Sequence, residues 1–490
     1  MSLQFITGNS GNGKTEYLFN RIVKEAKENP RDNYLVIVPE QFTMQTQRQL
    51  VDLSENKVIM NIDVLSFKRL AYRVFDELGI TNLTVLEETG KNLVLRKLAA
   101  QEADKLGVIG RNLNRIGYIS EVKSLLSELV QYNISPEELG RYIASGRLSD
   151  TLSDKLKDVL VLYEAFEKFM QDKYITAEEI LNVLSNVAEE SAILRNSVIA
   201  FDEFTGFTPI QNQLIKKLFV ISKKIYVTLT IDCREDIFKS RGMQELFDMP
   251  KRTVKSLTEM AAFYGIEVEE PIILDKNYRL AENEELSFME QQLFRKRRCS
   301  FKKAPKHIHI DCLRDPKQEL TKIARRINEL VRNENLRYRD IAIVTGDVNI
   351  YAGYVREIFD KYNIPYFIDA TQEILFHPFI EFIRSIPDIA AQNFSADAVF
   401  RFLRCGFSEL LDSEIDVLEN YVLACGVRGK SAWDKKWVRL PKHKAGYDLE
   451  LLNQSREYIM ELLKPVYQVF SDKKSTVKDY VLAIYKLIVL

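Results

Sequence analysis

Glycine, proline and cysteine are scarce in this chain of 490 residues. Gly 19 and Pro 13 together make 32 residues, about half the usual share of roughly 12%, and this favours helices over disorder. The five cysteines form no C-x-x-C pair, which is typical of reduced thiols and argues against disulfides or a zinc site. No stretch reaches the roughly 18 to 20 uninterrupted apolar residues of a membrane span, and the first residues lack a secretory signal pattern. We therefore expect a cytoplasmic chain with no membrane partner.

The chain also has no excess of one charge. It contains 69 Lys and Arg residues and 70 Asp and Glu residues, which gives a net charge of −1. Bulk charge therefore does not indicate a polyanion partner, and any nucleic-acid surface must arise from local clusters. The four histidines are scattered and support no catalytic triad. The length suffices for roughly three domains of about 150 residues, so the chain can bury more than one core.

The first motif joins a short strand pattern, residues 3–7, to the glycine-rich segment GNSGNGKT, residues 8–15, and then to a helical pattern. Strand, loop and helix follow in the order of a P-loop. Gly8, Gly11 and Gly13 permit backbone conformations in which N–H groups and the helix N-terminus hold phosphate oxygens. Lys14 would reach the terminal phosphates, and Thr15 would bind Mg²⁺ through its hydroxyl. The alternative is a chance glycine turn, which the flanking strand and helix disfavour.

Buried-strand patterns recur at residues 35–38, 198–201, 225–231, 307–313 and 341–344. Such continuous apolar runs suit parallel strands that are covered by helices on both faces. Between about 80 and 190 apolar residues stand at helical spacing instead, and Thr176 and Glu179 form a capping-box pair that opens a further helix. We predict an α/β protein with two parallel-sheet lobes, each with a helical insertion. The chain ends within an apolar helical pattern, so we expect it to be cut from a longer protein.

Two carboxylates, Asp202 and Glu203, directly follow the apolar strand pattern of residues 198–201. In P-loop ATPases this arrangement supplies one carboxylate to the Mg²⁺ shell and a second that positions or activates the attacking water. Acidic pairs at strand ends are also common in turns, so the pair alone would be ambiguous. The preceding P-loop favours the functional interpretation, with Thr15 and Asp202 as the metal ligands.

Several segments occur in the order and character of superfamily-one helicases of the UvrD and RecB type. They are GNSGNGKT, LVIVPEQFT, VLSFKRLAYRVF, FDEF, LDKNYRL and the stretch from DIAIVTGD to IPYFIDA. The chain resembles more closely the B subunits of AddAB (RexAB) helicase-nucleases, through VPEQFT, LSFKRLAYRV, the FTPIQ after the carboxylates, and IPYFIDA with HPFIEFIRS. This resemblance covers nearly the whole chain.

The resemblance implies a fold of two RecA-like lobes. On this basis we expect residues 1–80 and 190–275 to form the first lobe with the P-loop, and residues 81–189 its helical insertion. Residues 276–378 would form part of the second lobe, and residues 379–490 would begin a second helical insertion that is cut short.

The resemblance also implies a function. Such a protein pairs with an AddA-type subunit and processes double-strand DNA ends for recombinational repair, by ATP-driven unwinding and by exonuclease degradation. The B subunit is expected to bind ATP and single-stranded DNA and to scan for the recombination signal Chi. Its nuclease domain and its iron–sulfur cluster lie in a C-terminal part that this sequence does not contain, and none of the five cysteines shows the cluster spacing.

Single residues follow from the same resemblance, with one departure. Lys14, Asp202 and Glu203 match the ATPase pattern, and Arg279 in Asn277-Tyr278-Arg279 matches the arginine that such helicases direct at the γ-phosphate. Where those helicases place a glutamine-bearing motif, this chain has TIDCREDIF, residues 230–238, without a glutamine. An alternative is therefore an inactive helicase-like scaffold that binds DNA without ATP turnover. A third, based on the P-loop alone, is an unrelated P-loop kinase or small ATPase.

Candidate residues for a DNA channel lie in two segments. A single-strand channel needs aromatic faces that stack on bases, and cations or amides that hold phosphates. The candidates, which match channel positions in such helicases, are Gln41 and Thr43 after the second strand pattern and Phe67, Lys68, Arg69, Tyr72 and Arg73 at the start of the next helix. The alternative is that Phe67 and Tyr72 are core residues and the cations are merely solvated.

A basic cluster lies at residues 295–306, where seven of twelve residues are Lys or Arg. It could neutralise phosphates, each contact adding about 0.7 to the salt slope on a single strand, but we favour a solvated linker between lobes. His307 and His309 alternate along a strand pattern and could share one face. With no third ligand nearby, we interpret them as the polar face of a half-buried strand.

Overall fold

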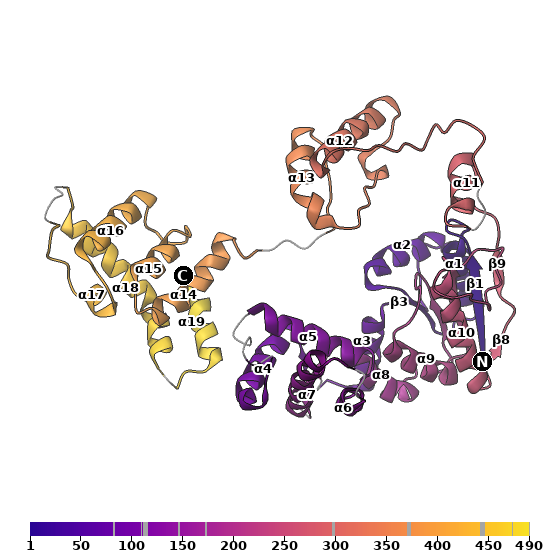
Figure 1. The fold of residues 1–490 in the computed structure, drawn as a ribbon, viewed down its shortest axis with the longest axis horizontal. Coiled ribbons are helices and arrows are strands. Elements are labelled where there is room, and N and C mark those ends of the chain that lie inside the picture. The colour runs from indigo at the N-terminus through magenta and orange to yellow at the C-terminus, as the bar shows by residue number, and fades with distance from the viewer. Residues whose placement is uncertain are drawn as a thin grey trace. The chain divides into compact units, whose positions relative to one another are not determined.

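The computed structural model describes residues 1–81, 84–108, 110, 116–145, 148–171, 174–295, 299–369, 374–441, 446–472 and 474–489. The chain divides into two compact units, Met1–Ile310 and Asp311–Leu490, drawn from indigo to yellow in Figure 1. Among the described residues, no helix is both long enough and apolar enough to span a membrane.

A parallel β-sheet forms the centre of the first unit. Its strand order is β3-β2-β6-β7-β1-β8, and β9 also pairs with β1; every pairing is parallel. The strands are β1 (Ser2–Gly8), β2 (Tyr34–Ile37), β3 (Ile62–Leu65), β6 (Val198–Phe201), β7 (Lys224–Thr230), β8 (Glu267–Val268) and β9 (Ile272–Leu274). The carboxyl ends of β1, β6 and β7 therefore share one edge of the sheet.

Helices cover both faces of this sheet, as the continuous apolar runs predict. One core contains Ile6 and residues of α1 (Lys14–Glu28) and α2 (Thr43–Leu53). The other contains Leu3 and Phe5 together with four helices on the opposite face. These are α3 (Phe67–Leu78), α8 (Ile180–Val187), α9 (Pro209–Ile221) and α10 (Asp248–Phe263). Neighbouring residues of β1 thus point to opposite faces, as the period of two along a strand requires.

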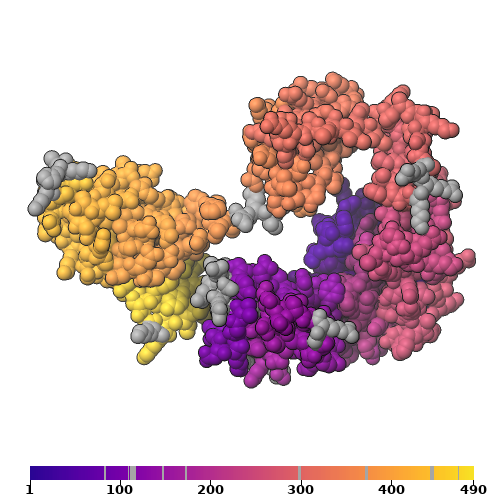
Figure 2. All heavy atoms as spheres, in the orientation of Figure 1, coloured from indigo at the N-terminus to yellow at the C-terminus, as the bar shows by residue number. Residues whose placement is uncertain are grey.

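A helical insertion separates α3 from α8, and in Figure 2 its purple surface is continuous with the rest of the first unit. Its helices are α4 (Glu88–Gln101), α5 (Ile116–Gln131), α6 (Pro136–Ala144) and α7 (Asp150–Met170). It has a core of its own around Leu95, Leu126 and Leu162. The predicted capping box is present, because the Glu179 N–H donates to Thr176 Oγ1 at 3.2 Å and the Thr176 N–H donates to Glu179 Oε2 at 2.6 Å.

The insertion also contains two short strands, which the helical pattern did not predict. β4 (Val85–Leu86) and β5 (Ile175–Thr176) pair in parallel at its base. Each has only two residues, which is too short for a period-two pattern to be recognised.

The second unit begins with α12 (Pro316–Asn333) and α13 (Val348–Lys361), and its described residues contain no strand. The predictions of strands at residues 307–313 and 341–344 are therefore wrong, and no parallel sheet forms in the described part of the second unit. An isolated pair of short strands is marginally stable without a third strand or a full helix layer. His307 and His309, expected on a half-buried strand, are both exposed, and His307 Nδ1 lies 3.5 Å from Glu285 Oε1.

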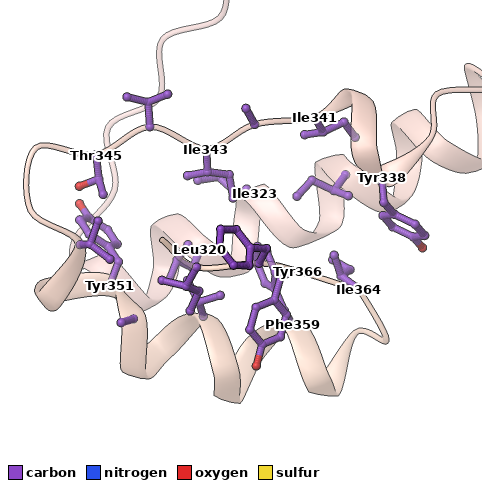
Figure 3. A pocket seen from close by; sticks show the side chains of 18 of the residues that line it. Leu320, Ile323, Tyr338, Ile341, Ile343, Thr345, Tyr351, Phe359, Ile364 and Tyr366 are labelled. Carbon is purple, nitrogen blue, oxygen red and sulfur yellow. The ribbon is translucent and has the colours of Figure 1, made fainter. Parts of the chain in front are cut away.

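The apolar residues near residues 341–345 nevertheless gather against the two helices. A cavity of about 920 Å³ lies between α12, α13 and the segments near residues 341–345 and 364–369 (Figure 3). Leu320, Ile343 and Tyr366 are among the residues that line it. The hydrophobic pattern thus marks residues that face α12 and α13, although no ladder of strand hydrogen bonds forms.

From residue 378 onward every regular element among the described residues is a helix, as expected. The helices are α14 (Pro378–Ala391), α15 (Ala396–Leu403), α16 (Asp412–Cys425), α17 (Lys430–Asp434), α18 (Leu449–Ser471) and α19 (Val477–Val489). They enclose a separate core in which Trp433 and Phe402 are almost fully buried.

Candidate nucleotide-binding site

The glycine-rich loop leaves the carboxyl end of β1 and enters α1 at Lys14. Gly11 and Gly13 have φ of 87° and 78°, the left-handed region that glycine adopts at little cost. Gly13 precedes the helix, and no side chain caps that end of α1. The first N–H groups of α1 therefore have no side-chain cap, an arrangement that can accept an anionic ligand.

Lys14 lies along this loop. Its Nζ donates hydrogen bonds to the carbonyl oxygens of Gly8 and Asn9 at 3.1 and 2.9 Å. Burial lowers the pKa of the Lys14 ammonium, and the negative charges of Asp202 and Glu203 offset this in part. A phosphate group would supply further negative charge and so favour the protonated amine.

The two carboxylates follow β6, at the sheet edge where the loop begins. Asp202 is 1% exposed; it accepts a hydrogen bond from the Thr228 hydroxyl through Oδ1, and its Oδ2 has no partner among the described residues. Burial raises the pKa of the Asp202 carboxyl, although the bond from Thr228 acts in the opposite direction. An unpartnered buried carboxylate oxygen is costly alone, and a cation would satisfy it.

Glu203 connects this strand end to the loop. The Thr15 hydroxyl donates to Glu203 Oε1 at 3.4 Å. Glu203 has φ of 63°, a left-handed conformation that non-glycine residues adopt rarely and that clusters at functional sites. The hydroxyl and the two carboxylates therefore converge, and they provide the oxygen ligands that Mg²⁺ prefers.

Residues 277–279 close the site from the other side. The N–H groups of Tyr278 and Arg279 donate to the Gly11 carbonyl at 3.0 and 3.3 Å, and Asn277 Nδ2 donates to the Ser10 carbonyl at 2.9 Å. A Cβ at Gly11 would lie 2.8 Å from the Arg279 Cβ, so this close approach requires glycine.

One cavity of about 680 Å³ contains most of the predicted nucleotide residues. Its lining includes Gly11, Gly13, Lys14, Thr15, Asp202, Glu203 and Arg279. Tyr278 also lines it, and its ring packs 3.5 Å from the position of a Cβ at Gly13. The sequence motifs did not indicate a role for Tyr278 or for the asparagines of the loop. One of these asparagines, Asn12, attaches the loop to β9, because its Nδ2 donates to the Leu274 carbonyl at 2.5 Å.

The candidate DNA residues divide into an exposed and a buried set. Gln41 is exposed in a short 3₁₀ turn, Glu40–Phe42, and Arg69 and Tyr72 are exposed on α3. Thr43 is 3% exposed, and its hydroxyl donates to the Glu40 carbonyl at 3.0 Å, where it supports the start of α2.

Phe67 belongs to the core. It is 7% exposed and lies in an aromatic cluster with Phe201, Phe204 and Phe207, with ring centroids 5.6 to 6.3 Å from its own. Its ring is therefore not available to stack on a base. The alternative that both aromatics are core residues thus agrees with the burial of Phe67 but not with Tyr72, which is 39% exposed.

The segment that lacks a glutamine is held by ion pairs. Asp232 is 2% exposed and binds Arg234 and Arg295, with oxygen–nitrogen distances of 2.6 and 3.0 Å. Burial alone would raise the pKa of Asp232, but hydrogen bonds and charge from Arg234 lower it to about 2. Arg295, from the basic cluster, thus stabilises the segment; residues 296–298 of that cluster lie outside the described residues.

A glycine loop between a parallel strand and a helix, facing an acidic strand end, defines the P-loop class of α/β proteins. Comparison with family models places the chain more closely. Residues 5–290, more than half of the chain, match the model described as "ADDB, N-terminal", so the chain belongs to this family.

Three similar proteins share one name, the B subunit of an ATP-dependent helicase/deoxyribonuclease. The protein from Lachnoclostridium phytofermentans is 39% identical over 495 residues, which cover 100% of this chain and 43% of that protein. Those from Clostridium tetani and Caldanaerobacter subterraneus are 32% and 33% identical, again over 100% of this chain and over 44% and 43% of theirs. The chain therefore spans about two fifths of the length of these relatives.

Proposed function

We propose that the chain is the N-terminal part of the B subunit of an AddAB-type helicase-nuclease, and that it binds ATP·Mg²⁺ in the cavity at Lys14. The observation that carries this proposal is the convergence of Lys14, Thr15 and the unpartnered Asp202 Oδ2 at one edge of the sheet. The name shared by the relatives supports ATP as the nucleotide.

The residues present suit Mg²⁺ and a nucleoside triphosphate. Thr15 and Asp202 would hold the ion, which neutralises charge on the transferring phosphoryl group. Glu203 would orient the attacking water, and Lys14 and the loop N–H groups would bind phosphate oxygens. Arg279 would add positive charge at the terminal phosphate, since it lines the same cavity. We assign no iron–sulfur cluster to the cysteines of this chain.

Single-stranded DNA would contact the outer face of α3 in this proposal. Lys68, Arg69, Tyr72 and Arg73 are exposed there, and they combine cations with an aromatic face. This composition suits sequence-tolerant binding of a single strand. Gln41 would add a further polar contact. In the assembled complex, an AddA-type subunit would share the DNA end, and this chain would scan the strand for Chi.

A second candidate function is a DNA-scanning scaffold that binds ATP but does not hydrolyse it. It is favoured by the segment 230–238, which has no glutamine and whose Asp232 is fully engaged with Arg234 and Arg295. This segment therefore offers no free side-chain amide through which the γ-phosphate could act on DNA binding.

Nucleotide turnover by the assembled complex separates the two functions. With the partner subunit's P-loop disabled, the proposal predicts residual DNA-stimulated ATP hydrolysis, which Lys14→Ala abolishes. The exposed Lys24 of α1 provides a matched control, because Lys24→Ala should leave turnover unchanged. Turnover that is absent while an ATP analogue still binds at Lys14 would establish the scaffold instead.

A further inference from the structure

Asn9, the second residue of the phosphate loop, has a side chain that is buried outside the nucleotide cavity and joins two other elements. It is 5% exposed. Its Oδ1 accepts a hydrogen bond from the Cys233 N–H at 3.0 Å, and its Nδ2 donates to Glu290 Oε1 at 2.7 Å. Cys233 follows β7, and Glu290 belongs to α11 (Glu284–Gln292). One buried amide thus uses its acceptor and a donor to bridge three segments.

The backbone of the same residue holds Lys14. The Asn9 carbonyl accepts from Lys14 Nζ at 2.9 Å. When Lys14 turns towards a phosphate oxygen, this bond and the bond to the Gly8 carbonyl are released. The side chain of Asn9 does not take part in that release, and it still binds Cys233 and Glu290. Lys14 and Glu290 thus bind the same residue, Lys14 through the Asn9 carbonyl and Glu290 through the Asn9 side-chain amide.

The bridge continues beyond Asn9 at the C-terminal end of α11. Arg234, next to Cys233, donates through Nη2 to the Gln291 carbonyl at 3.1 Å. Arg295, just after α11, binds Asp232. The end of β7, the phosphate loop and α11 therefore form one polar cluster. After α11 the chain passes to the second compact unit, which begins at Asp311.

We propose that Asn9 is the positioning residue that couples nucleotide binding at Lys14 to the stability of α11. This inference rests on the proposed nucleotide binding and extends it. Asn9 suits the role because a carboxamide can accept from one N–H group and donate to one carboxylate at the same time. An aspartate at this position could accept from Cys233 but would repel Glu290.

The test exchanges the two ends of the bond. In Asn9→Asp, two carboxylates face each other and the bridge to α11 is lost. In the double variant Asn9→Asp with Glu290→Gln, the amide introduced on α11 can donate to the carboxylate introduced in the loop, and the local charge equals that of the original pair. Glu290→Gln alone is the matched control, because its amide oxygen can still accept from Asn9. The full chain is used, with a non-hydrolysable ATP analogue and Mg²⁺ as the probe.

Two readouts are needed. We expect the analogue to slow hydrogen exchange at the amides of residues 284–292 in the unsubstituted chain and in Glu290→Gln. Asn9→Asp should bind the analogue about tenfold more weakly, as expected for loss of a hydrogen bond to a charged group, and should lose the effect on α11. The double variant should recover both properties.

Three results would overturn the inference: no effect of the analogue on α11 in the unsubstituted chain, normal behaviour of Asn9→Asp, or no recovery in the double variant. The first needs no substitution, so it remains decisive even if Asn9→Asp does not fold. Failure of nucleotide binding itself is distinguishable, because the unsubstituted chain would then not bind the analogue or Lys14→Ala would bind it equally well.

Discussion

A single buried carboxyl group, Asp202, carries much of the chemistry proposed for the site. Its neutral form is favoured by burial, whereas metal binding requires the ionised form. The free protein therefore bears an electrostatic cost at neutral pH that a bound cation would relieve. Metal binding thus favours the ionised form of Asp202, whereas the stability of the free protein favours the neutral form.

Asp202→Asn should stabilise the unligated protein at pH 7. The pKa of Asp202 is raised in the folded state, so its contribution to stability is present below its ordinary pKa of 3.8 and is lost as pH rises through the raised value. An asparagine at position 202 does not ionise, so this loss of stability at neutral pH does not occur, and its amide oxygen can still accept the hydrogen bond from the Thr228 hydroxyl. Thermal unfolding should show a Tm higher by a few °C, since about 1 kcal/mol corresponds to roughly 2–4 °C in a domain of 150–250 residues.

The same variant should lose the stabilisation that an ATP analogue with Mg²⁺ gives to the unsubstituted protein. Asp52→Asn is the control, because Asp52 is exposed in the same cavity. An Asp202→Asn protein that melts below the unsubstituted protein at pH 7 would contradict this account of the buried carboxyl.

Tyr72 is the aromatic residue of the proposed DNA surface, with 39% of its surface exposed. Tyr72→Ala should weaken binding to a single-stranded oligonucleotide by about 1–3 kcal/mol if one base stacks on the ring. Tyr72→Phe keeps the stacking face and should bind normally. A fluorescence anisotropy titration that finds equal affinities for all three proteins would remove α3 from the DNA path.

At the scale of elements, α3 shows why some residue roles could be predicted and others not. Its buried face consists of Phe67, Leu70, Ala71, Val74 and Phe75. Phe67 lies three and four residues before Leu70 and Ala71, so helical spacing itself indicates burial. Tyr72 and the neighbouring cations fall outside this stripe. The family resemblance selected Phe67 and Tyr72 alike as DNA-binding residues. The helical spacing of apolar residues, by contrast, places Phe67 on the buried face and Tyr72 outside it.

The strands predicted after residue 300 show where prediction from the hydrophobic pattern fails. Residues 341–344 have the apolar pattern of a buried strand, and Ile341 and Ile343 do line an apolar cavity. The hydrophobic pattern of a segment indicates which residues are buried. A β-strand also requires hydrogen-bond partners on a neighbouring strand for its backbone N–H and C=O groups. Those partners come from elsewhere in a chain, so a local pattern does not determine whether the ladder forms.

The helical insertion contains a buried cation, Lys91 of α4, that forms ion pairs with two carboxylates. Its side chain is 3% exposed, and its Nζ lies 2.8 Å from Glu88 and 2.7 Å from Glu178. Burial alone would lower the pKa of Lys91, but hydrogen bonds to the two carboxylates raise it. The amine therefore remains charged and joins α4 to the segment between β5 and α8.

Lys91→Ala should destabilise the insertion by about 1–3 kcal/mol, because it leaves the partly buried carboxylate of Glu178 without its partner. Lys91→Met with Glu178→Gln removes both charges and should cost less. Lys155→Ala, at an exposed position of α7, is the control. Urea unfolding measures these differences, and equal midpoints for Lys91→Ala and Lys155→Ala would show that the cluster does not stabilise the insertion.

At the scale of the whole molecule, the candidate site is assembled from residues far apart in the sequence. Lys14 and Asp202 meet because β1 and β6 are parallel and are separated only by β7. Parallel strands present their carboxyl ends at one edge, so the two motifs and the strand patterns together predict this meeting. The bond between Asn9 and Glu290 joins residues 281 positions apart, and no local pattern indicates it.

The measurement that tests the central claim most directly is calorimetric titration of the full chain with a non-hydrolysable ATP analogue and Mg²⁺. The account predicts one binding site per chain, dependence of its affinity on Mg²⁺, and loss of binding in Lys14→Ala but not in Lys24→Ala. Binding that is absent in the unsubstituted chain, or equal in the two lysine variants, would contradict it.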